Sequence, residues 1–493
     1  MTKMLKSTTA FSIFAFNLVI MTTAYSQDLT FSRHLFDTYD TYRDTALTHR
    51  RFKQADILPL IDRLKTDSRF DITKVGESVE KRPIQMIKVG TGPRKVLLWS
   101  QMHGDEPSAT MAIFDIFNLL RADGEFDEFK TKLLAETTLY FVPMLNPDGA
   151  ERYQRRNALD IDLNRDALRL QSPESVILKG LQQSLKPEVG FNLHDQSTRY
   201  SVGHTPKQAT ISFLATAYDE ARNINPVRER SMQLIVGMNR VLQQFIPGGV
   251  GRYSDEFEPR AFGDNIQKWG TTLILIESGG YPNDPEKQFI RKLNYVSILT
   301  ALQAIATDSY KAESRSEYNT IPENERYLFD VLIRKAQIMR GGKPVTVDIG
   351  INRYEVNVGN AATFGYRSSI DDFGDLSTFF GIEEIDATGL TVSPGQIHPD
   401  TLRSLADLKK YKLDSLVQKG VTTFRLAAPS RATTHLAPVH LLQPTTSAAR
   451  PIQTGRIPTF VLRRGNQLRY VFVNGFWLDV SNGSNKLGTG VVE

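Results

Sequence analysis

Short apolar runs alternate with longer helical stretches between residues 28 and 306. Lys95–Ser100 (KVLLWS) and Thr271–Ile276 (TTLILI) are almost continuously apolar or β-branched, which predicts strands that are buried on both faces of a sheet. Pro173–Leu185 and Arg230–Phe245 have the length and pattern of helices. Strands that alternate with helices predict an α/β domain with a largely parallel or mixed sheet.

The rest of the chain has a different pattern. Phe329–Ile333, Thr346–Ile351 and Arg469–Val473 are β-rich runs separated by Gly and Asn, without long helical stretches. A polar tract with Ser, Glu, Asn and Pro precedes them, as is typical of a linker. We therefore expect three parts after the amino-terminal segment: an α/β domain at residues 27–310, a linker at 311–326, and a smaller, mostly β, sandwich-like domain at 327–493.

The first 26 residues have the pattern of an export signal. Lys3 and Lys6 give a positively charged start, Phe11–Met21 is mostly apolar, and small residues precede a cleavage point before Gln27. The apolar run is shorter than the roughly 20 residues that a spanning helix needs. We expect residues 1–26 to be a signal peptide, and the mature protein to be secreted or periplasmic without a transmembrane segment.

Composition narrows the possible chemistry. The chain has 493 residues, a formal net charge of +5 and no cysteine. This small positive surplus disfavours a dedicated nucleic-acid binder, so we expect no nucleic-acid partner. The lack of cysteine excludes disulfides, thiolate zinc sites, iron–sulfur clusters and a cysteine nucleophile. Any metal must bind to His, Asp or Glu, and only eight histidines are available.

Candidate metal ligands and a candidate base follow the predicted strands. His103 and Glu106 come after Lys95–Ser100, His194 comes after the next buried run, and Glu277 directly follows Thr271–Ile276. Alone, the H-x-x-E spacing is more typical of a surface turn with a helix-capping acid than of a metal site. Together, His103, Glu106 and His194 supply the three protein ligands that a catalytic zinc site needs. A carboxylate at the position of Glu277 is expected to be partly buried, which is costly unless it is paired or functional.

An arginine-rich loop follows a further predicted strand, Leu139–Pro143. It contains an Asn-Pro-Asp-Gly turn, then Arg155-Arg156-Asn157 and Asp162-Leu163-Asn164-Arg165. Such a loop is either a solvated charged face or a cationic pocket, in which guanidinium groups bind a carboxylate with two hydrogen bonds.

The ordered set of motifs between residues 71 and 280 resembles the zinc carboxypeptidase family, the metallocarboxypeptidases of the carboxypeptidase A type. H-x-x-E, N-P-D-G, R-x-N, D-L-N-R, a later single His and a strand-ending Glu occur in the order of that family. The resemblance implies a mixed-sheet α/β fold and one Zn²⁺ ion. It also implies the following roles: His103, Glu106 and His194 as zinc ligands, Glu277 as general base and acid, Arg155 as the oxyanion donor, and Asn164 and Arg165 as the binders of the substrate's terminal carboxylate.

Three features differ from the family pattern or leave its details open. The family's mobile tyrosine is expected about twenty residues before the catalytic glutamate, where this chain has Asp255; Tyr253 is the nearest candidate, and loop packing would explain it equally well. Phe262 in the specificity region would favour an apolar terminal side chain, whereas Asp255 or Asp264 would favour a basic one. Asp195 follows His194 where many relatives have Ser, so a supporting role for it is possible.

The C-terminal part resembles the β-sandwich that flanks the barrel of amidohydrolases. The resemblance rests on Asp330–Ala336, Ile385–Gly395 and Val471–Gly475. A single His398 stands where those enzymes have an H-x-H metal motif, and too few residues remain for a barrel of about 250. We expect an accessory module without a catalytic barrel; a sandwich unrelated to amidohydrolases is the alternative.

These observations predict an exported zinc metallocarboxypeptidase. Its substrate would be a peptide with a free C-terminal carboxylate, whose last peptide bond is hydrolysed by a metal-activated water. One alternative is an amidase or peptidase that acts on cell-wall peptides or acylated amino acids. The other is a non-catalytic exported protein that binds peptides or glycans, although binding alone needs no buried general base.

Overall fold

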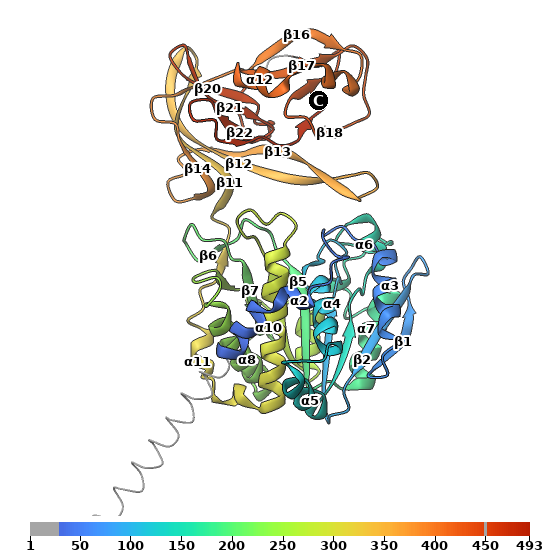
Figure 1. Ribbon diagram of the computed structural model, residues 1–493. Helices are drawn as coiled ribbons and strands as arrows, with labels where there is room; N and C mark the ends of the chain where they lie inside the picture. The colour runs from blue at the N-terminus through green and yellow to red at the C-terminus, as the bar shows by residue number, and fades with distance from the viewer. Residues whose placement is uncertain (1–28, 448–450) are drawn as a thin grey trace, which may run out of the picture. The chain divides into compact units, whose positions relative to one another are not determined.

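The computed structural model describes residues 29–447 and 451–493 and divides into two compact units (Figure 1). The α/β unit runs through Gly203 and again from Lys207 to Glu325, and the β unit comprises residues 204–206 and 326–493. The signal peptide predicted for residues 1–26 lies outside the described residues. Within the described ranges, no helix combines the length and apolarity that a membrane crossing requires.

An eight-stranded mixed sheet forms the centre of the α/β unit, in the order β1-β2-β4-β3-β5-β9-β7-β8. The four central strands β4, β3, β5 and β9 are parallel, whereas β1, β2 and β7 join antiparallel partners. The predicted mixed-sheet α/β fold is thereby confirmed. The strands are β1 (Phe70–Glu77), β2 (Pro83–Val89), β3 (Arg94–Ser100), β4 (Thr137–Val142), β5 (Val189–Asp195), β7 (Ile211–Leu214), β8 (Val250–Arg252) and β9 (Thr272–Ser278).

Helices cover both faces of this sheet because the central strands are apolar on both sides. On β3, Leu98 packs into one hydrophobic core and Trp99 into the other, and both are fully buried. The first core includes α3, α4, α5, α8 and α10; the second includes α7 and α9. The helices are α2 (Tyr39–Tyr42), α3 (Gln54–Leu64), α4 (Ser108–Arg121), α5 (Asp127–Glu136), α6 (Pro147–Arg152), α7 (Pro173–Leu185), α8 (Pro226–Leu242), α9 (Phe262–Lys268), α10 (Gln288–Thr307) and α11 (Arg315–Tyr318).

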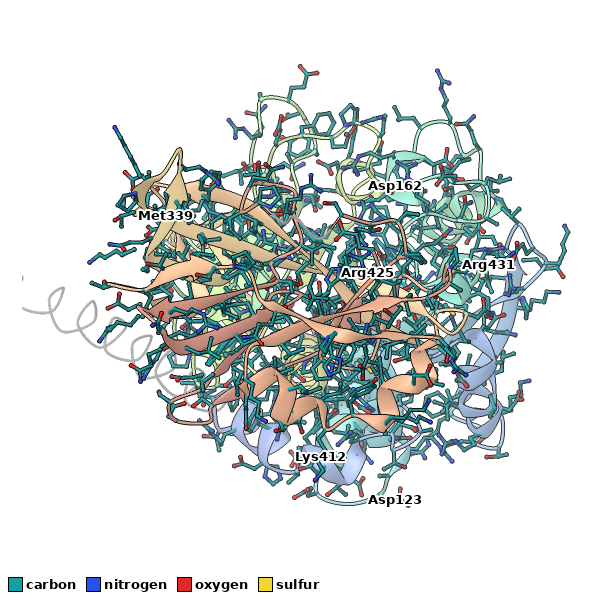
Figure 2. All side chains as sticks on the ribbon, turned by 90° about the horizontal axis from the view of Figure 1, so that it is seen from above. Asp123, Asp162, Met339, Lys412, Arg425 and Arg431 are labelled. Atoms are coloured by element: carbon teal, nitrogen blue, oxygen red, sulfur yellow. The ribbon has the colours of Figure 1, made fainter. Side chains whose placement is uncertain are left out.

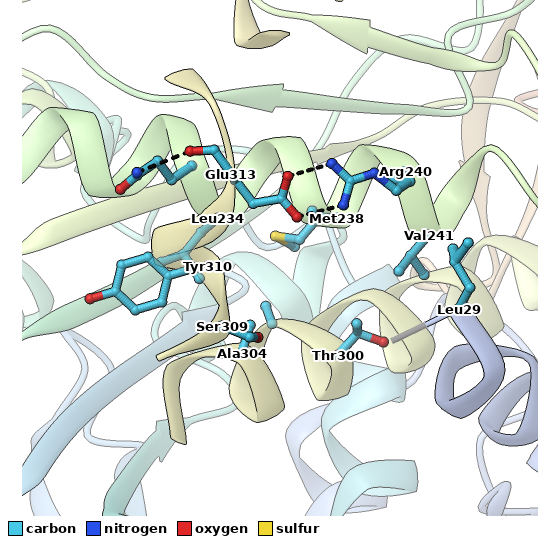
Figure 3. Close-up of a pocket in the computed structure, with 13 residues that line it drawn as sticks. Leu29, Leu234, Met238, Arg240, Val241, Thr300, Ala304, Ser309, Tyr310 and Glu313 are labelled. Carbon is cyan, nitrogen blue, oxygen red and sulfur yellow. Dashed lines mark hydrogen bonds and ion pairs between the residues drawn. The ribbon is translucent and has the colours of Figure 1, made fainter. Parts of the chain in front are cut away.

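The segment that the sequence predicts as a linker is packed onto the α/β unit as far as Glu325. Glu313 forms a two-pronged ion pair with Arg240 of α8 (Figure 3), and the hydroxyl of the buried Tyr318 accepts a hydrogen bond from the Ala215 amide. Strand β10 (Asn324–Glu325) then pairs with β6 (Ser201–Val202). A few buried anchors therefore hold this segment, although its composition is polar. The cavity drawn in Figure 3 has a volume of about 20 Å³, enough for a water molecule but not for a substrate.

The β unit consists mainly of strands, as predicted. A nine-stranded sheet and a three-stranded parallel sheet, β16-β17-β19, share a core in which Phe424 and Leu441 meet Val471. The side chain of Met339 stands near the tip of the β11–β12 hairpin (Figure 2). The elements are β11 (Leu328–Arg340), β12 (Lys343–Val358), β13 (Thr363–Gly374), β14 (Phe380–Asp386), β15 (Thr391–Ser393), β16 (Gln396–Leu402), α12 (Leu413–Gln418), β17 (Val421–Leu426), β18 (Thr434–His435), β19 (His440–Leu442), β20 (Phe460–Arg464), β21 (Gln467–Val473), β22 (Phe476–Asp479), β23 (Asn485–Lys486) and β24 (Gly490–Val491).

Candidate metal centre

The candidate ligands meet at the carboxyl edge of three neighbouring parallel strands. His194 lies near the end of β5 and is the register partner of Glu277 on β9, so the two side chains leave the same face of the sheet side by side. His103 and Glu106 lie on the loop that follows β3, the neighbour of β5 on its other side. This edge is the usual place for a site in an α/β sheet.

A close crossing of two loops positions His103 and Glu106. A Cβ on Gly104 would lie only 2.0 Å from the carbonyl carbon of Gly149, in the turn that begins α6. Asn146 holds this turn, because its side-chain oxygen accepts a hydrogen bond from the Gly149 amide at 2.9 Å. Glycine at position 104 therefore lets the two loops touch, whereas a Cβ on Gly149 would lie 2.5 Å from the side-chain nitrogen of Asn146 within its own loop.

The candidate ligand atoms of three residues lie close together. The Nδ1 atoms of His103 and His194 lie 2.8 and 2.7 Å from the two carboxylate oxygens of Glu106 and 3.1 Å from each other. All three residues are buried, at 1%, 2% and 7% exposure for His103, His194 and Glu106. Two imidazole nitrogens and a carboxylate that face one another are a donor set suited to Zn²⁺. These residues therefore fit the metal that the sequence implies.

Asp162 orients the first imidazole. Its Oδ1 lies 3.1 Å from Nε2 of His103, and in the tautomer that fits this contact Nε2–H donates to Asp162 and leaves Nδ1 available to a cation. Burial alone would raise the pKa of Asp162, but hydrogen bonds and charges from His103 and Arg155 together lower it below the usual range. Asp162 lies just before the 3-10 helix η1 (Leu163–Arg165) and is labelled in Figure 2.

Arg155 reaches the same cluster from the arginine-rich loop. Its Nε donates to Asp162 at 3.0 Å, and its Nη1 lies 3.3 Å from Oε1 of Glu106. The side chain remains 43% exposed, so its guanidinium lies between the buried ligands and solvent. The Arg155 guanidinium can therefore reach both the candidate metal ligands and a molecule that enters from solvent.

The environment of Glu277 disfavours the ionised form of its carboxyl group. Burial, followed by the negative charge of Glu106, raises the pKa of Glu277 well above the usual value for glutamate. A divalent cation bound beside Glu106 would offset that negative charge. Glu277 therefore has the environment of a proton acceptor that becomes active when a metal is present.

The predicted substrate-binding residues lie next to Asp162 in the chain. The side-chain oxygen of Asn164 accepts a hydrogen bond from the Phe262 amide at 2.9 Å, which ties η1 to the start of α9. Arg165 is exposed, and its Nε lies 3.2 Å from Glu258. The Tyr253 hydroxyl, just past β8, lies 3.3 Å from the Tyr200 hydroxyl. The role of Tyr253 as the cleft tyrosine stays a prediction.

The residues expected to set specificity have different environments. Asp255 is paired with the buried Arg228 at 2.5 Å and with Arg222 at 3.3 Å, so its charge is already compensated within the chain. Phe262 is fully buried in the second core, so packing accounts for an apolar residue at this position. Asp264 is buried on α9, and burial raises its pKa to about 7.

Sequence reasoning assigned no role to Asp162 and left that of Asp195 open. Asp195 accepts a hydrogen bond from Ser108, and its amide donates to Glu106 at 3.2 Å. The D-L-N-R motif contained Asp162, but its contact with His103 spans 59 positions and has no local signal. Such supporting contacts become visible only in the folded chain.

Comparison with known proteins points to one family. Residues 57–192 match the family described as zinc carboxypeptidase. Relatives include carboxypeptidase 2 of Trichophyton rubrum, which is 28% identical over 191 residues, covering 38% of this chain and 31% of the relative. Another is the probable carboxypeptidase 2 of Trichophyton verrucosum, with 25% identity over 191 residues, 38% of this chain and 32% of the relative. The matched region thus spans about a third of these relatives.

Solved structures of the same kind are similar to part of the chain. A metallo-carboxypeptidase from Burkholderia cenocepacia has a TM-score of 0.44 and 16% identity, over 52% of this chain and 70% of that one. A metallo-carboxypeptidase from Pseudomonas aeruginosa, in complex with (2-guanidinoethylmercapto)succinic acid, has a TM-score of 0.42 and 20% identity, over 52% and 70%.

Proposed function

We propose that this chain, whose α/β unit resembles the zinc carboxypeptidases over residues 57–192, is a zinc-dependent peptidase that removes the C-terminal residue of a peptide. One observation carries the proposal. The ligand atoms of His103, Glu106 and His194 all lie within 4.8 Å of one another, and Glu277 is the register neighbour of His194. The family match favours this function over a cell-wall amidase or a binding-only protein.

Zinc bound to the His-Glu-His group would supply a Lewis acid, which polarises a carbonyl and lowers the pKa of water toward about 7. Glu277 lies beside this group and would accept the proton of the attacking water. It would then pass that proton to the leaving amine as the peptide bond breaks. Without the metal, burial and the charge of Glu106 raise the pKa of Glu277 and favour its protonated form. A cation bound beside Glu106 would lower this pKa, so that Glu277 carries the charge that a proton acceptor needs.

Three residues of the loop before α7 would bind and orient the substrate. Arg155 lies beside Glu106 and would donate to the oxyanion that develops on the scissile carbonyl. Asn164 and the exposed Arg165 would bind the free α-carboxylate of the last residue, which sets the position of the scissile bond. A peptide without this carboxylate should therefore be a poor substrate.

Replacement of Glu277 by glutamine tests the proposal. Glu277→Gln keeps the shape of the side chain but removes the proton acceptor, so we expect zinc content to persist while turnover falls by about 10²–10⁴-fold. Peptides with a free C-terminus and the same peptides as C-terminal amides serve as substrates. Glu128→Gln, an exposed change on α5, is the matched control. Equal rates for Glu277→Gln and the native protein would remove Glu277 from the mechanism.

Two proposals concern the organisation of the chain. All proposed site residues lie between His103 and Glu277, so we propose that residues 27–310 carry catalysis and that residues 327–493 form an accessory domain. We also propose export through residues 1–26. Amino-terminal sequencing of the mature protein should begin at Gln27; a mature chain that retains Met1 contradicts the export proposal.

A further inference from the structure

A buried ion pair lies directly beside the candidate metal centre. Asp195 and Lys287 meet at 3.1 Å between Oδ2 and Nζ, with side-chain exposures of 7% and 6%. The hydroxyl of Ser108, at the start of α4, donates to the same Oδ2 at 2.7 Å. The other oxygen of Asp195 is shielded from solvent and has no hydrogen-bond partner in the described part of the chain. The negative charge of Asp195 thus depends on Lys287 for its compensation.

Both ends of this pair contact the residues that carry the site. Asp195 directly follows His194, and its amide donates to Oε2 of Glu106 at 3.2 Å. The Lys287 ammonium also donates to the carbonyl oxygen of Ser278 at 2.8 Å, and Ser278 directly follows Glu277. One ammonium group therefore ties together the ends of β5 and β9, at the position where each strand presents a site residue.

The local backbone holds Lys287 in this position. Lys287 has φ 52°, the left-handed region that non-glycine residues seldom adopt, and it immediately precedes α10. Asp284 accepts hydrogen bonds from the amides of Gln288 and Phe289 at 2.7 and 2.9 Å, which fixes the turn. A lysine that is 5% exposed in a strained conformation is costly. Buried ion pairs add little net stability, so stability alone is a weak explanation for this arrangement.

We propose that Lys287 is a positioning residue for the metal centre, which acts through Asp195 and the Ser278 carbonyl to hold Glu106, His194 and Glu277 in register. Its positive charge also offsets Asp195 in a site that already contains the carboxylates of Glu106 and Glu277. The inference rests on the proposed function for its effect on turnover, whereas its effect on zinc affinity can be measured without any substrate.

Zinc affinity of the full-length protein, measured by competition with a chromophoric chelator, tests this role. Residues that support metal ligands typically contribute 10–100-fold to affinity, so we expect Lys287→Met to bind Zn²⁺ at least tenfold more weakly. Lys132→Met, an exposed change on α5, should leave affinity unchanged. In the double variant Lys287→Met/Asp195→Asn, part of the affinity should return, because a neutral amide replaces the buried carboxylate that has lost its partner.

A folded Lys287→Met protein that binds zinc within twofold of the native affinity would overturn the proposal. If that variant does not fold, Ser108→Ala removes only one hydrogen bond to Asp195 and provides the same measurement. We expect it to lower zinc affinity severalfold, and an unchanged affinity would again overturn the proposal. Zinc affinity that depends on Lys287 in a protein without peptidase activity would contradict the proposed function but not this inference.

Discussion

Nε2 of His103 lies 3.1 Å from Oδ1 of Asp162, a residue 59 positions later in the chain. The same carboxylate accepts a hydrogen bond from Nε of Arg155 through its second oxygen at 3.0 Å. Asp162 thereby fixes the direction of the candidate metal-binding imidazole and of the nearest guanidinium at once. A single side chain couples the metal ligands to the residue proposed to stabilise the oxyanion.

Removal of Asp162 should therefore weaken metal binding and slow turnover together. We expect Asp162→Ala to lower zinc affinity by about 10–100-fold, because the His103 ring loses the partner that selects its tautomer and orientation. Chelator competition measures the affinity, and hydrolysis at saturating zinc measures the remaining loss. Asp160→Ala, an exposed acid two residues earlier, is the control. Native zinc affinity in Asp162→Ala would show that His103 is oriented by other groups.

Replacement of Arg155 should affect turnover more than metal content. Arg155→Met removes the donor proposed for the oxyanion, and we expect kcat/KM to fall by about 10²–10³-fold, or about 2.7–4 kcal/mol of barrier. Zinc content by metal analysis should stay close to one ion per chain. The neighbouring Arg156→Met, whose native side chain is 51% exposed, provides a matched control. A threefold or smaller change in Arg155→Met would contradict the assigned role.

Acid should destabilise the β unit through His435. Burial, followed by the charge of the neighbouring His440, lowers the pKa of His435 to about 4, from 6.5 for an ordinary histidine. Between about pH 4 and pH 6.5, His435 is protonated in the unfolded chain but neutral in the folded chain. The free energy of unfolding is therefore unaffected by His435 above about pH 6.5 and decreases by about 3 kcal/mol as the pH falls to 4.

Thermal unfolding of the full chain at pH 7 and pH 4.5 measures this effect. His435→Phe should reduce the loss of stability between the two pH values, whereas the exposed His49→Gln should not change it. An identical pH dependence in His435→Phe and the native protein would exclude His435 as the titrating group.

The strands and the grouping of the candidate ligands were predictable because their signals are local. Lys95–Ser100 and Thr271–Ile276 were predicted as strands and correspond to β3 and β9, and the helix predicted at Pro173–Leu185 is α7. An apolar run followed at once by a charged side chain identifies both a buried strand and the edge where it ends. Parallel pairing then brings the ends of β3, β5 and β9 together.

The supporting contacts could not be predicted because they join distant positions. Lys287 lies in a polar tract that resembles an ordinary surface turn, and only the fold brings its ammonium to Asp195, 92 positions away. Residues 311–326 were interpreted as a linker because polar residues dominate them. In the structure, Glu313 pairs with Arg240 and Tyr318 accepts a hydrogen bond from Ala215, and both contacts hold this stretch on the α/β unit. The average polarity of the stretch gives no sign of these two individual contacts.

The packed stretch from Glu313 to Glu325 defines how short an intact version of the α/β unit can be. A polypeptide cut after residue 310 would leave Arg240 without its carboxylate partner, the Ala215 amide without the Tyr318 hydroxyl and the edge of β6 without β10. Shortened forms made to study catalysis apart from the β unit should therefore retain everything through Glu325.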